Sequence, residues 1–305
     1  MNILVTGGAG FVGANLCVKL IDKGYKVFII DDLSTGSEKN IPPNTDFFRL
    51  NLSFQETYNK LPKNIDIVFH LSSQVSSEKS FLDPINDMKR NSFATLLLLE
   101  WSLNNSIKKF IYTSTMGVYS DGLKEAANEC SKINPKSFYG FNKRSSENFI
   151  ELYSQKGLKS TIFRLFNCYG PGQNMADFDQ GMLSIYLAYL LLDKPVLVKG
   201  SLDRTRDFVY IDDVTDAVLL GLKSKSTNNI YNVCSGKETS VKQLIKELLV
   251  ATNKSSNYPI NILPRTPNDI DQIWGDCNKL KDDFDWLPKY SLKDGIKKYI
   301  SLLNI

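Results

Sequence analysis

Histidine is almost absent from this sequence, since His70 is the only one among 305 residues. The five cysteines are odd in number and widely scattered, with no C-x-x-C pair. We therefore expect neither a disulfide framework nor a metal site. A chain of this kind is held together by an ordinary hydrophobic core, and its unpaired cysteines are typical of a cytoplasmic protein.

Long apolar runs and strong charge are also missing. The most apolar stretch outside a strand, residues 182–192, is too short to span a bilayer. No basic n-region or cleavage site follows Met1, so we expect neither secretion nor a membrane segment. The net charge of +4 has no basic block behind it. This balance argues against nucleic-acid binding, although it would attract an anionic metabolite.

Short apolar runs alternate with helical patterns through the first half of the chain. Parallel strands need long crossovers, so this alternation predicts a parallel sheet with helices on both faces, a doubly wound α/β fold. The length of 305 residues suits one large α/β domain with a smaller appendage. The expected strands are residues 3–5, 26–30, 65–71, 109–113 and 160–166, and the expected helices are residues 11–23, 85–104 and 138–156.

The regular alternation of apolar strands and helices ends after Gly170, Pro171 and Gly172. Residues 253–269 are rich in Asn, Ser and Pro, and we expect them to form a long irregular connection. The rest of this half is expected to form helices at residues 181–192, 213–222 and 241–251 and strands at residues 196–198, 208–211 and 230–233.

A glycine-rich turn, TGGAGFVG, directly follows the first expected strand. Gly7, Gly10 and Gly13 satisfy the dinucleotide-binding pattern, in which glycines allow a tight turn and the approach of a pyrophosphate to bare backbone. The helix that starts at Phe11 and Val12 would offer its N–H groups to the phosphates. A glycine turn without a ligand is the plainer alternative, but the flanking strand and helix favour the dinucleotide site.

Two acids, Asp31 and Asp32, end the second expected strand, and Asp31 lies 18 positions beyond Gly13. A carboxylate at this place accepts hydrogen bonds from the ribose hydroxyls of NAD and repels the 2′-phosphate of NADP. We therefore predict NAD as the cofactor and Asp31 as its ribose ligand. For Asp32, the alternative is an acid on a surface loop.

Tyr139 and Lys143 are four positions apart near the start of an expected helix, so the phenol and the ammonium share one face. A free tyrosine, with a pKa of about 10, is a poor base at neutral pH, but a neighbouring ammonium favours its phenolate. Y-x-x-x-K is also common as a surface pair. The preceding strand ends in Ser114 and Thr115, where open α/β sheets bind ligands. Thr115 could hydrogen-bond a reacting oxygen, whereas Ser114 could simply satisfy the strand end.

Taken in order, these motifs resemble those of the extended short-chain dehydrogenase/reductase family, which binds NAD on a Rossmann-type sheet. The resemblance continues in FRLFNCYGPGQ from Phe163, in RDFVYIDD from Arg206, and in residues 274–288. Within this family the motifs are most similar to those of nucleotide-sugar 4-epimerases of the UDP-glucose 4-epimerase type. The resemblance implies an NAD-binding domain of residues 1–168 with about 207–235, and a smaller nucleotide-sugar-binding α/β domain of about 169–206 and 236–305.

The resemblance also implies roles for single residues. Tyr139, Lys143 and Thr115 would carry the catalysis. Asn167 and Arg206 would hold the diphosphate of the substrate, since the planar fork of arginine pairs with phosphate oxygens. Arg265 and Asp269 would face the second phosphate and the nucleotide ribose, with Ser114 as a further substrate contact. The implied NAD site comprises Gly7, Gly10, Phe11, Val12, Gly13, Asp31, Asp32, Asn51, Leu52, Leu71, Ser72, Ser73, Asn91, Tyr139 and Lys143.

Departures from the family's patterns narrow the reaction. Dehydratases of the family have Asp-Glu directly after the catalytic threonine, and decarboxylases have Glu at the second of these positions, whereas Met116 and Gly117 follow Thr115 here. Members that epimerise at C3 and C5 use a cysteine and a histidine, but His70 lies at a strand end and is expected to be structural. The segment LSSQV from Leu71 lacks the lysine with which some epimerases hold NAD.

The resemblance thus implies an NAD-dependent nucleotide-sugar 4-epimerase that oxidises C4 transiently, with a UDP-hexose or UDP-N-acetylhexosamine as the default substrate. A C4 dehydrogenase or ketoreductase with net NAD(H) turnover, acting for example on a GDP-linked hexose or heptose, stays open, and the missing lysine favours it. A 2-epimerase and a non-catalytic NAD-binding regulator are further alternatives. The family's usual homodimer would join the helices near 91–105 and 139–156. Ala94, Leu97, Leu98 and Trp101 could form this interface, and ordinary packing on their own sheet is the alternative for each of them.

Overall fold

The central feature of the protein is a sheet of seven parallel strands. In this computed structural model, which describes residues 1–176, 181–224, 227–266 and 268–303, the strand order is β11-β6-β5-β4-β1-β2-β3. The order reverses beside β1, as in doubly wound sheets, so the predicted fold class is confirmed. The strands are β1 (Asn2–Thr6), β2 (Lys26–Asp31), β3 (Asp46–Arg49), β4 (Ile67–His70), β5 (Lys109–Thr115), β6 (Ser160–Leu165) and β11 (Asn228–Val233).

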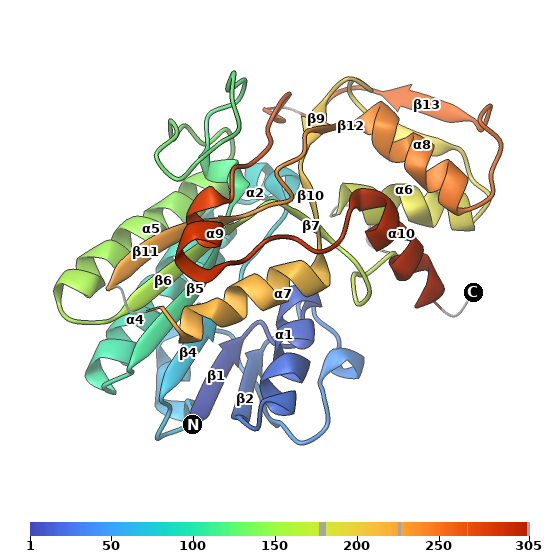
Figure 1. Ribbon diagram of the computed structural model, residues 1–305. Helices are drawn as coiled ribbons and strands as arrows, with labels where there is room; N and C mark the ends of the chain where they lie inside the picture. Colours follow the sequence, from blue (N-terminus) through green and yellow to red (C-terminus); the bar gives the residue numbers. More distant parts are fainter. Residues whose placement is uncertain (177–180, 225–226, 267, 304–305) are drawn as a thin grey trace.

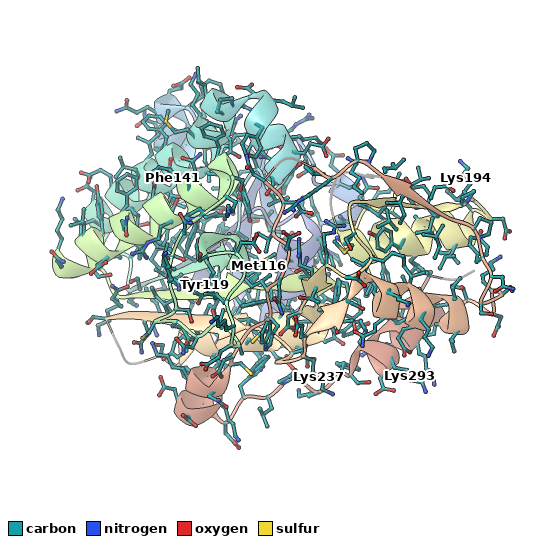
Figure 2. The ribbon with its side chains drawn as sticks, turned by 90° about the horizontal axis from the view of Figure 1, so that it is seen from above. Met116, Tyr119, Phe141, Lys194, Lys237 and Lys293 are labelled. Atoms are coloured by element: carbon teal, nitrogen blue, oxygen red, sulfur yellow. The ribbon has the colours of Figure 1, made fainter. Side chains whose placement is uncertain are left out.

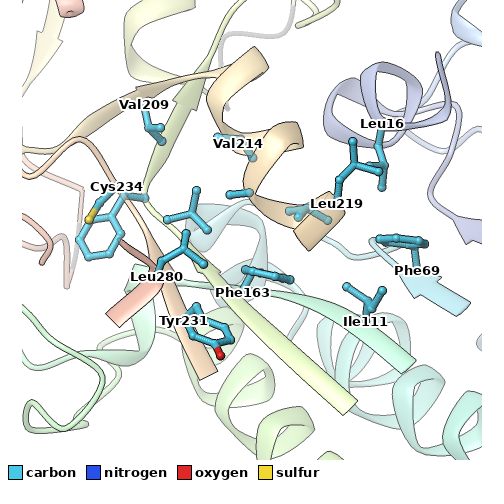
Figure 3. Packing of buried hydrophobic residues seen from close by; sticks show 14 of the residues in the cluster. Leu16, Phe69, Ile111, Phe163, Val209, Val214, Leu219, Tyr231, Cys234 and Leu280 are labelled. Atoms are coloured by element: carbon cyan, nitrogen blue, oxygen red, sulfur yellow. The ribbon is translucent and has the colours of Figure 1, made fainter. Parts of the chain in front are cut away.

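Helices cover both faces of the sheet (Figure 1). Successive residues of a strand point to opposite faces, and here both faces are apolar. Val5 of β1 belongs to the core shared with Leu16 and Val214, which Figure 3 shows from close by, whereas Leu4 belongs to the core shared with Leu98 and Ile150. The first core contains residues of α1 (Phe11–Asp22), α7 (Ile211–Leu219) and α9 (Asn278–Phe284), and the second contains residues of α4 (Ala94–Asn104) and α5 (Phe138–Gln155).

The expected helix at residues 85–104 is divided in the structure. It begins as α3 (Pro84–Met88), continues through a π-helical turn, η3 (Lys89–Phe93), and ends as α4. A further short helix, α2 (Ser77–Leu82), precedes it. The 3₁₀ turns of the described chain include η1 (Glu38–Asn40), η2 (Gln55–Lys60), η4 (Met116–Val118) and η5 (Leu220–Leu222).

A smaller group of elements lies beyond the carboxyl edge of the sheet (Figure 1). Its helices enclose a third apolar core that contains Leu187, Leu244 and Ile296. The proposed division into two domains stays a prediction, and this separate core supports it. The elements are α6 (Met182–Leu191), α8 (Val241–Ala251), α10 (Leu292–Ser301), and the strand pairs β7 (Asn167–Tyr169) with β10 (Phe208–Tyr210), β9 (Thr205–Arg206) with β12 (Thr239–Ser240), and β8 (Val196–Lys199) with β13 (Ile260–Leu263).

Two expectations from the sequence are wrong. The stretch 253–269 is not wholly irregular, because β13 lies within it and pairs in parallel with β8, so a distant partner and not local composition makes it a strand. Ala94 and Leu98 do not face a partner subunit, because both are buried in the chain's own core. In the part of the chain that the structure describes, no helix is long and apolar enough to cross a membrane.

Candidate active site

A cavity of about 980 Å³ lies at the carboxyl ends of the central strands and extends toward α6 and β9. Its lining includes Gly7 after β1, Asp31 at the end of β2, Leu71 after β4 and Thr115 at the end of β5. At its other end it is lined by Arg206. The volume lies at the upper end of the range typical of ligand sites, so the cavity can hold large ligands.

The glycine loop is shaped by close backbone contacts. A Cβ atom on Gly13 would lie 2.1 Å from the carbonyl oxygen of Gly7, and a Cβ on Gly7, whose φ is +72°, would lie 2.7 Å from the Ser72 nitrogen. Gly10 is the N-cap of α1 and provides no side chain to cover the helix end. Bare backbone and a helix N-terminus therefore face the cavity together, and this arrangement fits the pyrophosphate of a dinucleotide. Gly7, Gly10, Phe11, Val12 and Gly13 all line the cavity.

Asp31 is tied to the glycine loop. Its Oδ2 atom accepts a hydrogen bond of 3.0 Å from the Ala9 nitrogen, and its Oδ1 atom accepts one of 2.9 Å from the Leu33 nitrogen. Burial raises the pKa of Asp31, while these hydrogen bonds lower it. Asp32 lies beside it and forms an ion pair of 2.9 Å with Arg90, so its carboxylate already has a protein partner.

The NAD-site residues predicted after β3 also reach the cavity. Asn51 and Leu52 are both part of its lining. The side-chain oxygen of Asn51 accepts a hydrogen bond of 2.9 Å from the Ser53 nitrogen. This bond fixes the orientation of the Asn51 amide, and its oxygen retains a second lone pair.

Leu71, Ser72 and Ser73 line the cavity after β4, whereas Asn91 does not. Asn91 is buried behind Ser73, whose hydroxyl donates a hydrogen bond of 2.6 Å to the Asn91 Oδ1 atom. The Asn91 amide nitrogen donates to the Gln74 carbonyl at 3.1 Å and to Asp87 at 3.0 Å. The structure therefore places Asn91 as a support of this loop and not as a wall of the cavity.

Tyr139, Thr115 and Lys143 all line the cavity. Tyr139 lies in the first turn of α5, and Gly140 beside it packs so closely on η4 that a Cβ would lie 2.5 Å from the Gly117 carbonyl oxygen. This close approach brings the phenol to the end of β5, where Tyr139 and Thr115 share a hydrogen bond. Figure 2 shows Met116, the residue after Thr115, near the middle of the molecule.

The two titratable groups of this trio are strongly perturbed. Burial lowers the pKa of Lys143 to about 7, against the opposing attraction of Asp87 and Glu147. Burial raises the pKa of Tyr139 to about 12, with a further rise from Asp87 and a lowering from the Thr115 hydrogen bond. Groups with such shifts in a cavity are typical of sites that move protons.

Asp87 is a buried residue of this site that sequence reasoning missed. Its carboxylate accepts hydrogen bonds from three amides, those of Gln74 at 2.6 Å, Asn91 at 3.0 Å and Asn142 at 2.7 Å. It therefore joins the loop after β4 to α5 directly before Lys143, and its charge acts on that ammonium. The spacing of four between Asp87 and Asn91 was the one local signal that the two share a helix face.

At the opposite end of the cavity lie Asn167 and Arg206, which were predicted to bind a diphosphate. The Asn167 Oδ1 atom is buried without a hydrogen-bond partner among the described residues, as expected for an atom that awaits a ligand. The residue after Arg206, Asp207, is fixed by hydrogen bonds that its carboxylate accepts from Ser235, Gly236 and Gly275. The remaining predicted contact, Ser114, is buried and lines the cavity.

Asp269 and Arg265 differ in their relation to the cavity, although the Arg265 side chain donates a hydrogen bond to the Asp269 backbone carbonyl oxygen. Asp269 lines the cavity, and its two oxygens accept hydrogen bonds from Arg206, at 2.8 Å, and from Arg204. Arg265 is exposed, pairs with Asp271 at 3.0 Å, and is not among the described residues that line the cavity. Arg204 does line it and had no role in the sequence-based prediction.

His70 is fully buried at the end of β4. Its two ring nitrogens lie 2.7 Å from the Thr6 hydroxyl and 3.0 Å from the Thr95 hydroxyl. Burial lowers its pKa to about 3, and the Lys143 charge lowers it further. A neutral imidazole with a hydrogen-bond partner at each ring nitrogen is suited to the structural role that we expected.

A parallel sheet with this switch in strand order, a glycine loop at its first turn and a tyrosine–lysine pair on the helix near β5 define an enzyme of the short-chain dehydrogenase/reductase type. The chain belongs to the NAD dependent epimerase/dehydratase family, whose family model matches residues 3–234. The predicted cofactor, NAD, is therefore confirmed at the level of the family.

Individual proteins are similar over the whole chain. The crystal structure of UDP-glucose 4-epimerase from Thermotoga maritima with UDP-glucose has a TM-score of 0.95 at 35% identity, covering 100% of this chain and 99% of that one. A Methanocaldococcus jannaschii protein, named provisionally as a UDP-glucose 4-epimerase, is 33% identical over 99% of this chain and 98% of its own length. UDP-glucuronic acid decarboxylase 1 of Arabidopsis thaliana is 29% identical over 99% of this chain and 69% of its own length. The resemblance is thus confirmed, while overall similarity includes proteins named for different reactions.

Proposed function

We propose that this protein is an NAD-dependent 4-epimerase of a nucleotide-diphosphate sugar, with a UDP-hexose or UDP-N-acetylhexosamine as its substrate. The observation that carries the proposal is the position of Tyr139, Thr115 and Lys143 between two anion-binding ends of one cavity. The glycine loop with Asp31 at one end suits NAD, and Arg206 at the other suits a second diphosphate. An enzyme that must hold both ligands at once needs this arrangement.

The chain's own residues would move and hold the proton of the reaction. Tyr139 takes the proton of the sugar's C4 hydroxyl and later returns it, while Thr115 hydrogen-bonds the same oxygen and orients it. Lys143 stabilises the phenolate form of Tyr139 through its positive charge. NAD, when bound, supplies the redox chemistry, because it takes up a hydride and gives it back. Asn167 and Arg206 fix the diphosphate, so the sugar ring can turn its other face while the nucleotide stays in place.

The side chains next to Thr115 support epimerisation over dehydration and decarboxylation. Met116 and Gly117 both line the cavity there. Neither a thioether nor a glycine can protonate a leaving hydroxyl, which dehydration requires. The tyrosine, the threonine and the lysine that the described cavity wall offers for the reacting carbon suit a reaction whose net result is inversion.

The test is to incubate the purified protein with NAD⁺ and, in separate reactions, UDP-glucose, UDP-N-acetylglucosamine and GDP-sugars. Proton NMR follows the sugar, and NADH is followed by its absorbance. We expect the C4 epimer to form without net NADH. Accumulation of NADH with a 4-keto sugar would instead assign a C4 dehydrogenase, and no change in any sugar would favour a non-catalytic NAD-binding protein.

Tyr139→Phe tests the assignment of the base. We expect it to lower kcat by about 10²- to 10⁴-fold, the usual contribution of acid–base catalysis. Tyr258→Phe is the matched control, since it removes the hydroxyl of a tyrosine that bonds the Lys194 carbonyl away from the cavity. Activity of Tyr139→Phe close to that of the wild type would end this account of the mechanism.

We also propose that two copies of the chain associate through the outer face of α2, α3 and α5. Leu82 is 81% exposed and Phe141 63% exposed, and Ile85 and Met88 are exposed beside them. Phe141 lies near the start of α5, where Figure 2 labels it. Large apolar side chains gathered in this way are typical of an interaction surface. The family's usual homodimer also uses α5, which supports a second copy as the partner.

Sedimentation at micromolar concentration tests the association. The wild type is expected to sediment as a dimer and Phe141→Asp as a monomer, because the buried carboxylate would lose its hydration. Val250→Asp is the control, since Val250 is also exposed but lies on α8. A monomeric wild type, or a dimer that Phe141→Asp leaves intact, would contradict this interface.

A further inference from the structure

Three arginines lie near the end of the cavity at β9, and they are not equivalent. Arg204 and Arg206 both line the cavity, and the side chain of each is 4% exposed. The Arg265 side chain is 42% exposed and is not among the described residues of the lining. Of these three arginines, only Arg204 and Arg206 are therefore buried positive charges at the wall of the cavity, where a ligand would contact them.

Arg204 and Arg206 share a single carboxylate. They are two positions apart in extended chain, so their side chains leave it on the same side. Asp269 accepts a hydrogen bond from Arg204 through Oδ2 and one of 2.8 Å from Arg206 through Oδ1. Two guanidinium groups and one carboxylate together leave one net positive charge. Asp121, which is not part of the described cavity lining, also attracts the Arg206 guanidinium. A buried charge without full compensation is costly, so this end of the cavity favours an anion.

The guanidinium groups also have more donors than these contacts use. Arg204 donates to the Ser201 carbonyl at 3.3 Å, to Asp269 and to the Tyr186 side chain. Arg206 donates to the Thr205 carbonyl at 2.7 Å and to Asp269. Each guanidinium carries five N–H donors in a planar fork, so donors beyond these can pair with phosphate oxygens.

We propose that Arg204 and Arg206 act as a pair that binds the diphosphate of the substrate, with Asp269 as their shared counter-ion. The inference rests on the proposed nucleotide-diphosphate substrate and deepens it. It gives Arg204 the role first expected of Arg265, whose side chain instead pairs with Asp271 and donates a hydrogen bond to the Asp269 backbone carbonyl. Two guanidinium groups match two phosphates, so the pair selects nucleoside diphosphates over monophosphates.

Calorimetric binding of UDP and UMP to the protein saturated with NAD⁺ tests the pair. We expect Arg204→Gln and Arg206→Gln each to weaken UDP binding by about 10- to 100-fold, as for the loss of a hydrogen-bonded charge, and to weaken UMP binding less. Arg265→Gln tests the rival assignment, and we expect it to weaken UDP binding less than Arg204→Gln does, because the exposed Arg265 side chain contacts Asp269 only through its backbone carbonyl. The opposite order, in which Arg265→Gln binds UDP weakly and Arg204→Gln binds it as the wild type does, would contradict the proposed arginine pair.

Two further variants separate binding from folding. Arg204→Lys keeps the positive charge but loses the planar guanidinium. We therefore expect its affinity for UDP to lie between that of the wild type and that of Arg204→Gln, and its affinity for NAD to be unchanged. Asp269→Asn leaves both guanidinium groups uncompensated, so we expect a lower Tm without nucleotide and a larger increase of Tm on adding UDP than in the wild type. An Asp269→Asn variant that UDP stabilises no more than the wild type would contradict the counter-ion role.

The same titration distinguishes this inference from the proposed function. A wild type that binds none of UDP, GDP and CDP would contradict both. A wild type that binds UDP while Arg204→Gln binds it equally well would leave the proposed function standing and would reject the arginine pair alone.

Discussion

Lys143 donates a hydrogen bond of 2.9 Å to the backbone carbonyl oxygen of Thr113. Thr113 lies in β5 two residues before Thr115, so the ammonium is anchored to the strand that carries the candidate catalytic hydroxyl. Lys143 is 3% exposed, and its burial lowers its pKa to about 7. The protein thus holds, inside its candidate active site, a lysine that changes charge near neutral pH.

The first prediction concerns the pH dependence of stability. The pKa of Lys143 falls from its ordinary 10.5 to about 7 on folding, so between these values the unfolded chain binds more protons. The free energy of unfolding therefore rises with pH in this interval, by at most about 1.4 kcal/mol per pH unit for this group. The difference between wild type and Lys143→Met, measured by urea denaturation, should rise from pH 7 to 9.5 and be flat below pH 6. A difference that stays constant over this pH range would contradict the lowered pKa of Lys143.

Asp87→Asn gives a second prediction on the same group. The Asp87 carboxylate attracts the Lys143 ammonium and so raises its pKa against the effect of burial. Without that charge, we expect the pKa of Lys143 to fall further below its ordinary value. In the Asp87→Asn background, the pH-dependent difference between Lys143 and Lys143→Met should therefore begin to rise at lower pH. An unchanged onset would show that Asp87 supports the loop and α5 only through its hydrogen bonds.

Tyr139 supplies the third prediction. Burial raises its pKa to about 12, so the phenol is neutral in the protein without cofactor near neutral pH. The proposed reaction needs a phenolate, and the positive nicotinamide of NAD⁺ would favour it. We expect saturating NAD⁺, but not NADH, to lower the pH at which Tyr139 ionises. The measurement is the ultraviolet phenolate signal of the wild type minus that of Tyr139→Phe, and equal titrations with both forms of the cofactor would exclude this effect.

How far the sequence could predict the site depends on whether a residue's role is local. Gly13 and the Tyr139–Lys143 pair belong to patterns whose chemistry needs those residue types at that spacing, and the sequence revealed them. Asp87 and Arg204 could not be found in this way, because their partners are distant. Asp87 accepts from Asn142, 55 positions away, and Arg204 donates to Asp269, 65 positions away.

The same limit applies to the fold. Most positions in the predicted strands of the central sheet are apolar, which is the pattern of strands buried on both faces. By contrast, β13 has polar and exposed positions and forms because β8 offers it a partner, through bonds such as that from the Val196 nitrogen to the Pro259 carbonyl at 3.0 Å. The π-helical turn η3 contains neither glycine nor proline, so no residue type in it predicted an irregular helix.

Gly13→Ala provides the fourth prediction. The added methyl group would lie 2.1 Å from the Gly7 carbonyl oxygen, so the loop backbone must move. We expect a loss of about 1–3 kcal/mol in the free energy of unfolding from overpacking, and weaker NAD binding by calorimetry because the loop no longer fits the pyrophosphate. Gly122→Ala is the control, since no atom lies within 4 Å of its Cβ position, although its φ of +69° also strains an alanine. NAD binding of Gly13→Ala equal to that of the control would contradict the role of this loop.

The fifth prediction concerns an ion pair at the cavity. Glu78 of α2 and Lys199 of β8 approach to 2.8 Å, both line the cavity, and their side chains are 47% and 46% exposed. An exposed pair contributes about 0–1 kcal/mol, so Lys199→Met should change the free energy of unfolding by no more than about that amount. Because the pair joins residues 121 positions apart at the wall of the cavity, we expect its loss to speed the release of UDP.

Stopped-flow measurement of the UDP dissociation rate checks this expectation. An increase of about two- to fivefold corresponds to the strength of such a pair. Glu78→Gln should give the same increase as Lys199→Met, and the double variant should add nothing, since each change breaks the same contact. High salt should bring the wild-type rate toward that of the variants, because it screens exposed charges. Additive effects of the two substitutions would instead mean that Glu78 and Lys199 act on the ligand separately, and the ion pair would have no part in retaining it.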